Sequence, residues 1–144
     1  MRRRPASSRW FAEVEMQVQF YDVDAMHIVW HGNYVKYLEV ARCALLDKIG
    51  YNYDAMQASG YAWPVVDLSV RYVAPATFGQ RIVLRADIVE WENRLKIDYL
   101  ISDAATGTRL TRASSTMVAV DLATKEMCFA SPAILFKQLG LEPA

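Results

Sequence analysis

The feature that most constrains the fold is one long helical pattern at residues 34–49. Its apolar residues recur at intervals of three and four, which is the spacing of an amphipathic helix. They are Tyr34, Tyr37, Leu38, Ala41, Leu45 and Ile49. The predicted polar side carries Lys36, Glu39, Arg42 and Asp47. Gly50 follows as a helix stop. Because the apolar residues are so dense, the helix must be covered on most of its sides.

Segments before and after this helix alternate apolar and polar residues, which predicts half-buried strands. Before the helix, one strand is expected at residues 13–21, with Val14, Met16, Val18 and Phe20 on its inner face. After the helix, four more strands are expected, at residues 63–73, 81–91, 95–102 and 110–121.

Short turns join the four later strands, so we expect an antiparallel meander in which each strand pairs with the next. One apolar helix must then lie against a curved antiparallel sheet, which is an α+β layer arrangement. A short helical segment is expected at residues 53–58. Ser131 and Pro132 predict the N-cap and first residue of another short helix.

Length and composition predict one domain without a membrane-spanning segment. At 144 residues, the chain can bury a core without disulfides or metal. We expect a flexible tail at residues 1–12 and a single domain at residues 13–140. The 16 basic and 16 acidic residues cancel, so no net charge draws the chain to nucleic acid or to a membrane. Cys43 and Cys128 match no metal or redox spacing, and a cytoplasmic location is expected.

The segment between the first strand and the long helix concentrates reactive side chains. Residues 21–34 read YDVDAMHIVWHGNY and hold both histidines of the chain. Backbone N–H groups at a helix start lack intrahelical partners and suit an oxyanion. An acid that precedes such a start supplies a nucleophile or general base for acyl transfer. The sequence contains no Gly-x-Ser-x-Gly motif, so Asp24 is the better candidate.

Each of these residues also has a purely structural interpretation. Asp22 or Asp24 can simply cap a turn. His27 and His31 have the spacing of two metal ligands on one helix, but their segment does not look helical and the chain has no third histidine. No metal site is therefore predicted. Trp30 is the kind of side chain that more often packs in a core than lines a substrate site.

Residues 21–42, YDVDAMHIVWHGNYVKYLEVAR, resemble the motif of the 4-hydroxybenzoyl-CoA thioesterase family, whose members have the hotdog fold. The matching positions are Asp22, Asp24, Ile28, Val29, Trp30, His31, Asn33 and Tyr34. Residues 63–91 resemble the family's second and third strands, and residues 103–127 its closing hairpin. The likeness implies a long central helix wrapped by a curved antiparallel sheet of about five strands.

The resemblance implies an acyl-CoA thioesterase without a cofactor, in which CoA is part of the substrate. Asp24 would be the catalytic carboxylate, as nucleophile or general base. The backbone N–H of His31 would polarise the thioester carbonyl, and its imidazole is included among the predicted catalytic groups. The predicted substrate-binding residues are His27, Trp30, Asn33, Tyr34 and Arg94, the last beside CoA phosphates. The family forms homodimers and homotetramers whose sites are built from two subunits.

One departure from the family pattern keeps other functions open. The family usually has glycine where this chain has His27, which would crowd the site or add an imidazole to it. The alternatives are an acyl carrier protein thioesterase and a non-catalytic acyl-thioester binder or scaffold. A hydratase-like member is a further alternative, because Asp22 and His27 have its Asp-x-x-x-x-His spacing. The motif that follows His27 suits the thioesterase better.

Overall fold

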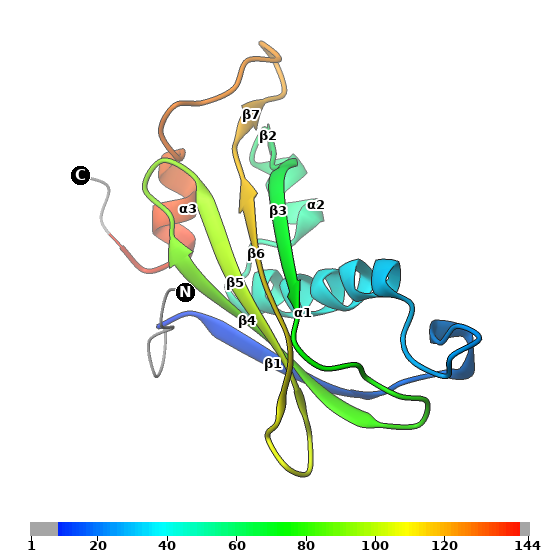
Figure 1. Cartoon of the computed structure of the whole chain (residues 1–144). Helices are drawn as coiled ribbons and strands as arrows, with labels where there is room; N and C mark the ends of the chain where they lie inside the picture. The colour runs from blue at the N-terminus through cyan, green and yellow to red at the C-terminus, as the bar shows by residue number, and fades with distance from the viewer. Residues whose placement is uncertain (1–8, 142–144) are drawn as a thin grey trace.

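The computed structural model describes residues 9–141 and shows one helix packed against a five-stranded antiparallel sheet (Figure 1). The strand order is β1-β4-β5-β6-β3. The sheet strands are β1 (Phe11–Gln17), β3 (Val65–Tyr72), β4 (Arg81–Glu90), β5 (Leu95–Asp103) and β6 (Arg109–Met117), and a two-stranded ribbon joins β2 (Tyr61–Ala62) to β7 (Val120–Asp121). The helices are α1 (Tyr34–Lys48), α2 (Tyr53–Ala58) and α3 (Ala133–Gln138), with 3-10 turns at Phe20–Asp22 and His31–Asn33. The predicted α+β class is confirmed.

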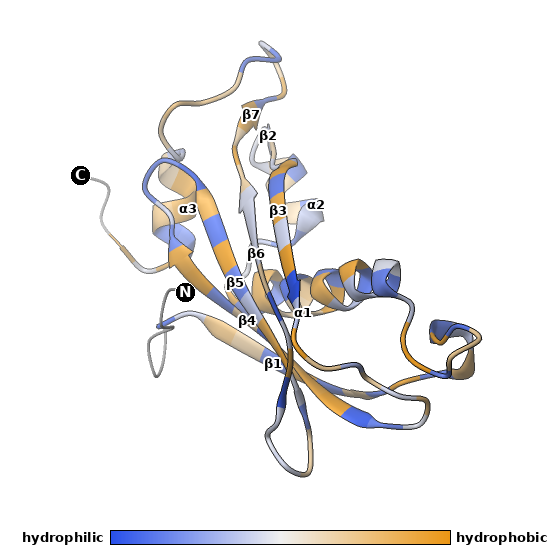
Figure 2. Ribbon diagram, viewed as in Figure 1, coloured by the Kyte–Doolittle hydropathy of each residue, from blue (hydrophilic) through white to orange (hydrophobic). Residues whose placement is uncertain are grey.

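The core lies between α1 and the sheet. In Figure 1, α1 runs across the back of the strands, and its contacts are mainly with β1 and β4. Figure 2 shows apolar and polar residues alternating along β4 and β5. The apolar set points toward the helix and is buried, as the period-two pattern predicts: Ile82, Leu84, Ala86, Ile88, Leu95, Ile97, Tyr99 and Ile101.

The pairing of β3 differs from the predicted meander. β4, β5 and β6 pair in chain order, but β3 pairs with β6 and not with β4. The connection at residues 73–80 therefore passes from one edge of the sheet to its interior. Short turn signals such as Pro75 and Gly79 mark where a strand ends, but they do not determine which neighbour it joins.

The predicted polar side of α1 was wrong at one position, because Arg42 is buried. Its Nε donates to the hydroxyl oxygen of Tyr53 at 3.0 Å, and its Nη1 donates to the hydroxyl oxygen of Tyr99 at 3.3 Å. Two phenol oxygens thus bind the buried guanidinium, and its Nη2 lies 3.8 Å from Glu39 Oε2 on the same helix. Periodicity could not indicate this, since the two tyrosines lie on α2 and β5.

The first predicted strand ends earlier than its alternation suggested. β1 stops at Gln17, and Phe20 lies in a 3-10 turn with 75% of its surface exposed, so its predicted place on the inner face was wrong. At its other end, the ring of Trp10 packs edge-on against Trp91 at 4.9 Å, and its indole N–H donates to the carbonyl oxygen of Leu139. Residues 10–12 therefore belong to the fold, while most of the predicted tail lies outside the described residues.

The edge strand β3 is largely uncovered. Of its eight residues only Val70 is partly buried, and the others are exposed. Apolar side chains on and beside this strand are exposed as well: Val65, Val66, Leu68, Tyr72 and Val73. The predicted strand at residues 110–121 is divided into β6 and β7, and the last helix begins one residue later than predicted, with Pro132 as its N-cap. The apolar edge of β3 is therefore open in the single chain.

Candidate active site

The residues that precede α1 form a small hairpin that holds Asp24 near its tip. Val23 bridges Val29, the backbone N–H of Asp24 donates to the carbonyl oxygen of Ile28 at 2.9 Å, and His27 N–H donates to Asp24 O at 2.9 Å. The Asp24 carboxylate accepts the backbone N–H of Met26 through Oδ1 at 2.8 Å. Asp24 therefore caps this turn, as the structural interpretation predicted, and its other carboxylate oxygen has no partner within residues 9–141.

The hairpin is tied to the start of α1 through Asp22. The carbonyl oxygen of Asp22 accepts the backbone N–H of Trp30 at 3.0 Å and the side-chain amide of Asn33 at 2.8 Å. The Asp22 carboxylate is buried and accepts the backbone N–H of Gln19. The two acids thus have different surroundings: Asp22 is a buried structural group, and Asp24 is half-buried on the hairpin that leads to α1.

The start of α1 offers backbone donors on the same side of the fold. The N–H groups of His31 and Gly32 find no backbone acceptor among the described residues outside the helix, as expected at a helix start. The indole of Trp30 lies over Gly32, so that a Cβ built there would come within 2.2 Å of Trp30 Cζ3. Glycine is therefore needed for this placement of the indole.

Aromatic residues form one wall beside the helix start. Tyr34 packs edge-on against Tyr72 at 5.2 Å and against Tyr37 at 5.9 Å. The Tyr72 hydroxyl donates to the carbonyl oxygen of His31 at 2.7 Å. Burial raises the pKa of the Tyr37 phenol, and the nearby Asp22 carboxylate adds to the rise. Tyr72 was not predicted as a site residue, because only the β3–α1 contact reveals it.

His27 occupies a backbone conformation that explains why the family favours glycine there. Its φ is +66°, in the left-handed region where a side chain is strained. His27 is exposed. A residue with a Cβ in this conformation costs about 1 kcal/mol relative to glycine. The histidine that replaces the family's usual glycine at position 27 is therefore a strained residue in the turn that holds Asp24.

The structure brings His27, Trp30, His31, Asn33 and Tyr34 to the Asp24 end of α1, but it does not bring Arg94 there. Arg94 follows the far end of β4 and pairs with Glu90, Nε to Oε2, at 3.2 Å. Its predicted contact with CoA phosphates stays a prediction and would need a second subunit.

Two absences hold for residues 9–141. No group of three or more His, Cys, Asp and Glu side chains lies close enough to hold a metal ion. In the same residues, no helix is long and apolar enough to cross a membrane.

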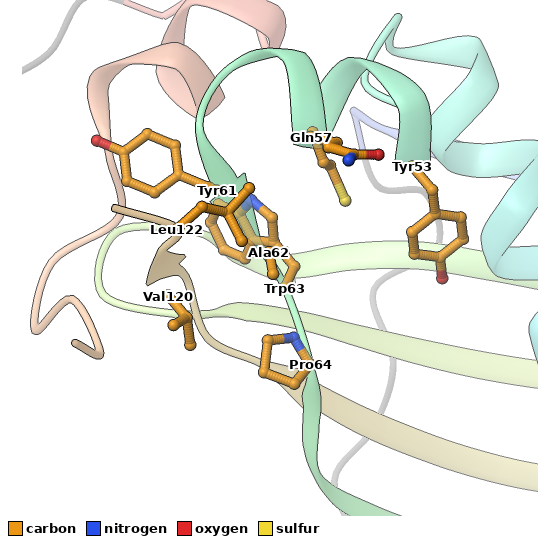
Figure 3. A pocket seen from close by; sticks show the side chains of 9 residues that line it. Tyr53, Gln57, Tyr61, Ala62, Trp63, Pro64, Val120 and Leu122 are labelled. Atoms are coloured by element: carbon orange, nitrogen blue, oxygen red, sulfur yellow. The ribbon is translucent and has the colours of Figure 1, made fainter. Parts of the chain in front are cut away.

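An apolar pocket lies at the other end of β3 (Figure 3). Its volume is about 460 Å³, within the range of roughly 300–1,000 Å³ that small-molecule sites have. It is lined by Tyr53, Met56, Gln57, Tyr61, Ala62, Trp63, Pro64, Val120 and Leu122. Trp63 is fixed in this wall by its indole N–H, which donates to the Tyr51 hydroxyl at 3.1 Å.

Comparison with known proteins identifies the family. A family profile described as the thioesterase-like superfamily matches residues 18–137. A putative acyl-CoA thioesterase of Bacillus subtilis, YneP, is 32% identical over 108 residues, which cover 74% of this chain and 78% of that protein. A putative esterase of Synechocystis is 31% identical over 134 residues, which cover 92% of this chain and 80% of that protein.

The fold has close counterparts among solved structures. A 1,4-dihydroxy-2-naphthoyl-CoA thioesterase from Synechocystis superposes with a TM-score of 0.80 at 23% identity, covering 90% of this chain and 96% of that chain. At this identity the likeness shows the fold alone. The match to the family profile and the identity to the sequence relatives show which family the chain belongs to. The chain therefore belongs to the thioesterase-like superfamily, and its fold is the hotdog fold that the sequence resemblance predicted.

Proposed function

We propose that the chain hydrolyses acyl-CoA thioesters, with Asp24 as the catalytic carboxylate and the start of α1 as the oxyanion site. The observation that carries this proposal is the tie between hairpin and helix, in which Asp22 O bonds to Trp30 N–H and to the Asn33 amide. This tie joins the hairpin that carries the half-buried Asp24 to the helix start that carries the N–H groups of His31 and Gly32, which supports the proposal. Acyl transfer requires these two elements.

The proposed reaction uses only protein groups and water. Asp24 either attacks the thioester carbonyl or removes a proton from the attacking water. The carbonyl oxygen becomes negative, and the N–H groups of His31 and Gly32 stabilise it. The carbon–sulfur bond then breaks, and the thiolate leaves as CoA and takes up a proton. If Asp24 is the general base, the water oxygen has already joined the carbonyl carbon and the carboxylic acid is released directly. If Asp24 is the nucleophile, the acyl group stays on its carboxylate as an anhydride, which water then hydrolyses to the free acid and the Asp24 carboxylate. We therefore expect chelating agents to leave the rate unchanged.

The test is CoA release by Asp24→Asn protein over a panel of fatty acyl-CoA and aryl acyl-CoA thioesters. Asparagine keeps the Oδ1 that accepts Met26 N–H, so the turn should survive while the carboxylate is lost. Loss of a general base or nucleophile of this kind typically costs about 100-fold or more in rate. We expect that loss, with acyl-CoA binding retained.

Asp22→Asn is the matched control, because it makes the same chemical change two residues away at a buried structural acid. It should retain most of the activity if the assignment to Asp24 is right. Equal losses in the two variants would contradict the assignment. Hydrolysis of acyl carrier protein thioesters but of no acyl-CoA would favour that alternative substrate, and binding without turnover of either would favour a binder.

We also propose that the enzyme is a homodimer in which two β3 strands pair antiparallel. The bond from Val73 N–H to Leu110 O shows that odd-numbered residues of β3 face β6 with their backbone groups. The backbone groups of Leu68, Val70 and Tyr72 therefore point to the open edge. Such an edge, with exposed apolar side chains, is a template for another strand.

The charges of β3 favour one register for this pairing. A twofold axis at Ser69 places Asp67 opposite the partner's Arg71, and Arg71 opposite the partner's Asp67. It also pairs Leu68 with the partner's Val70, both with outward backbone groups. Opposite charges directly across an antiparallel pair stabilise it by roughly 0.2–1 kcal/mol each. Within its own chain, Arg71 on β3 is directly opposite Arg112 on β6, and these two positive charges repel each other. A carboxylate of the partner on the other side of Arg71 would offset this repulsion.

A further inference from the structure

The buried Arg42 is hydrogen-bonded to Tyr53, one of the residues that line the apolar pocket. This guanidinium donates to two tyrosine hydroxyl oxygens, Tyr53 at 3.0 Å and Tyr99 at 3.3 Å. The Tyr99 oxygen also lies 2.7 Å from the hydroxyl oxygen of Ser115. Tyr99 thus has two polar partners, Arg42 as a donor and the Ser115 hydroxyl, with which either oxygen can donate.

Tyr53 receives the same bond but has no equivalent of Ser115. Within residues 9–141, the Tyr53 proton has no acceptor in hydrogen-bonding position. Arg42 donates to the Tyr53 oxygen, so the phenol proton is left available for a donated hydrogen bond. Tyr53 is 45% exposed and lines the pocket. Figure 3 shows it across the pocket from Trp63, Pro64 and Val120. The pocket therefore combines apolar walls with the available Tyr53 hydroxyl, and the Gln57 side chain belongs to the same lining.

We propose that this pocket binds the acyl group of the thioester and that Tyr53 selects acyl groups with a distal hydrogen-bond acceptor, such as a hydroxyl or carbonyl oxygen. The walls match the apolar part of such a group, since small-ligand sites combine apolar lining with a few placed polar groups. Arg42 is a positioning residue, because it acts through Tyr53. The proposal rests on the proposed hydrolase function and extends it to the class of acyl group.

The pocket of one subunit would serve the Asp24 site of the other. Pro64 precedes β3, while Tyr72 ends it and bonds to His31 at the candidate site. A strand of eight residues spans about 26 Å, so the pocket is far from the site of its own chain. With the twofold axis at Ser69, Pro64 lies opposite the partner's Ala74, just beyond the partner's Tyr72. An acyl group bound at the Asp24 site of one subunit would then reach the pocket of the other subunit by crossing the boundary between them.

The first test compares matched thioesters that differ only by a distal hydroxyl: phenylacetyl-CoA with hydroxyphenylacetyl-CoA, and octanoyl-CoA with its terminally hydroxylated form. The measured quantity is the ratio of kcat/KM values within each pair. We expect the wild-type enzyme to favour the hydroxylated member of at least one pair. Tyr53→Phe should reduce that ratio about 10-fold, the effect of one well-placed hydrogen bond.

Tyr61→Phe is the matched control. Tyr61 also lines the pocket, but its hydroxyl points away from Tyr53 and the other labelled side chains (Figure 3). It should leave the ratio within about 2-fold of the wild type, because it removes no donor from the pocket. The proposal is wrong if neither pair shows a preference, or if Tyr53→Phe changes the ratio no more than Tyr61→Phe.

The second test asks which subunit supplies the pocket. Asp24→Asn has an intact pocket and no carboxylate, whereas Ala62→Trp or Leu122→Trp has the carboxylate and a filled pocket. Each variant alone should be inactive. In a randomly mixed sample, half of the dimers combine one chain of each kind and regain one of two sites, or about one quarter of wild-type activity. No recovery from mixed dimers of either blocking variant would overturn the shared site.

The two proposals fail in different ways. If Asp24→Asn keeps its activity, the catalytic assignment fails, yet the effect of Tyr53→Phe on the substrate ratio can still be measured. If Asp24→Asn is inactive and Tyr53→Phe leaves the ratio unchanged, the hydrolase stands and the acyl-pocket proposal fails. If Tyr53→Phe raised KM equally for every thioester, including acetyl-CoA, the pocket would instead be assigned to the CoA part of the substrate, and the proposal would also be overturned.

Discussion

The indole of Trp30 covers Gly32 so closely that any side chain on residue 32 would collide with it, the nearest ring atom lying 2.2 Å from a Cβ built there. Trp30 is itself 49% exposed, so this contact holds the ring over the helix start and not in the core. The segment at residues 21–34, which is rich in acids and aromatic residues, thus contains a close contact between the Trp30 ring and the Gly32 backbone.

Gly32→Ala should push the Trp30 indole away from the start of α1. Because the ring can swing into solvent, we expect a modest loss of unfolding free energy, on the order of 1 kcal/mol. Thioesterase activity should fall more, since Gly32 supplies one of the proposed oxyanion donors. The measurements are urea unfolding, kcat for the best thioester of the panel, and tryptophan fluorescence.

A double-mutant cycle with Trp30→Ala separates the contact from the intrinsic effect of alanine at position 32. If the collision is the cause, Gly32→Ala should cost little in the Trp30→Ala background. Additive losses in the double variant would mean that the methyl group acts on something other than the indole.

His27→Gly should stabilise the turn beside Asp24. The left-handed φ of +66° costs a residue with a Cβ about 1 kcal/mol, although glycine loses part of this gain through the unfolded state. We expect the free energy of unfolding to rise by up to about 1 kcal/mol. The control is His27→Ala, which removes the imidazole but keeps the Cβ and its strain. Equal stabilities for the two variants would show that φ is not the cause.

The two variants also test the imidazole of His27 in the reaction. If the imidazole contributes, alanine and glycine should lower kcat to the same extent. If its main effect is to crowd the site, glycine should raise kcat/KM for bulky acyl groups more than alanine does.

The strands and helices followed from local pattern, because the sheet has one buried face and the helix a wide apolar one. Ile82, Leu84, Ala86 and Ile88 are buried as their alternation predicted. Pairing order did not follow, since turn residues say where β3 ends but not that it joins β6. The prediction that Arg42 lies on the polar side of α1 was wrong for a related reason. A charged residue is buried where it has hydrogen-bond partners, and one of these, Tyr99, lies on a strand distant in sequence.

The site was predictable to the extent that it is contiguous in sequence. Asp24, His31 and Tyr34 lie within eleven consecutive residues, on the hairpin and at the start of α1. Tyr72 was missed because its role depends on a contact between β3 and the start of α1. The pocket residue Tyr53 gave no signal either, as its orientation comes from Arg42, a residue that looked like ordinary helix surface.

Asp103 should make stability depend on pH in the acid range. Its carboxylate accepts from the Gln80 amide at 2.7 Å and from the backbone N–H groups of Thr106 and Ala105, and these bonds lower its pKa to about 2. An unfolded Asp has a pKa of about 3.9. Because the folded value is depressed, the contribution is fully present above about pH 4 and is lost as pH falls toward 2.

Urea unfolding at several pH values between about 6 and 2 measures this contribution as a slope of stability against pH. Asp103→Asn should flatten part of that slope, and Gln80→Leu should flatten it less, since the backbone donors remain. Identical slopes in the wild type and Asp103→Asn would show that the folded pKa is not depressed.

A single charge reversal on β3, at Asp67 or Arg71, should weaken the dimer, and combining the two reversals should restore it. Arg71→Asp places like charges opposite each other twice, because the twofold axis at Ser69 repeats each pair. Two lost attractions and two new repulsions, at roughly 0.2–1 kcal/mol each, should weaken the dimer by about 4-fold at least and by up to nearly 1,000-fold. Asp67→Arg should have the same effect for the same reason.

The double variant Asp67→Arg with Arg71→Asp restores both opposite-charge pairs and should regain most of the wild-type affinity. The dissociation constant is measured by sedimentation equilibrium at low salt, and the differences should shrink at high salt because exposed charges are screened. A double variant as weak as either single one would contradict the Ser69 axis. If all four proteins dimerise equally, the subunits pair through a surface other than β3, and the pocket near Pro64 would then not face the partner's Asp24.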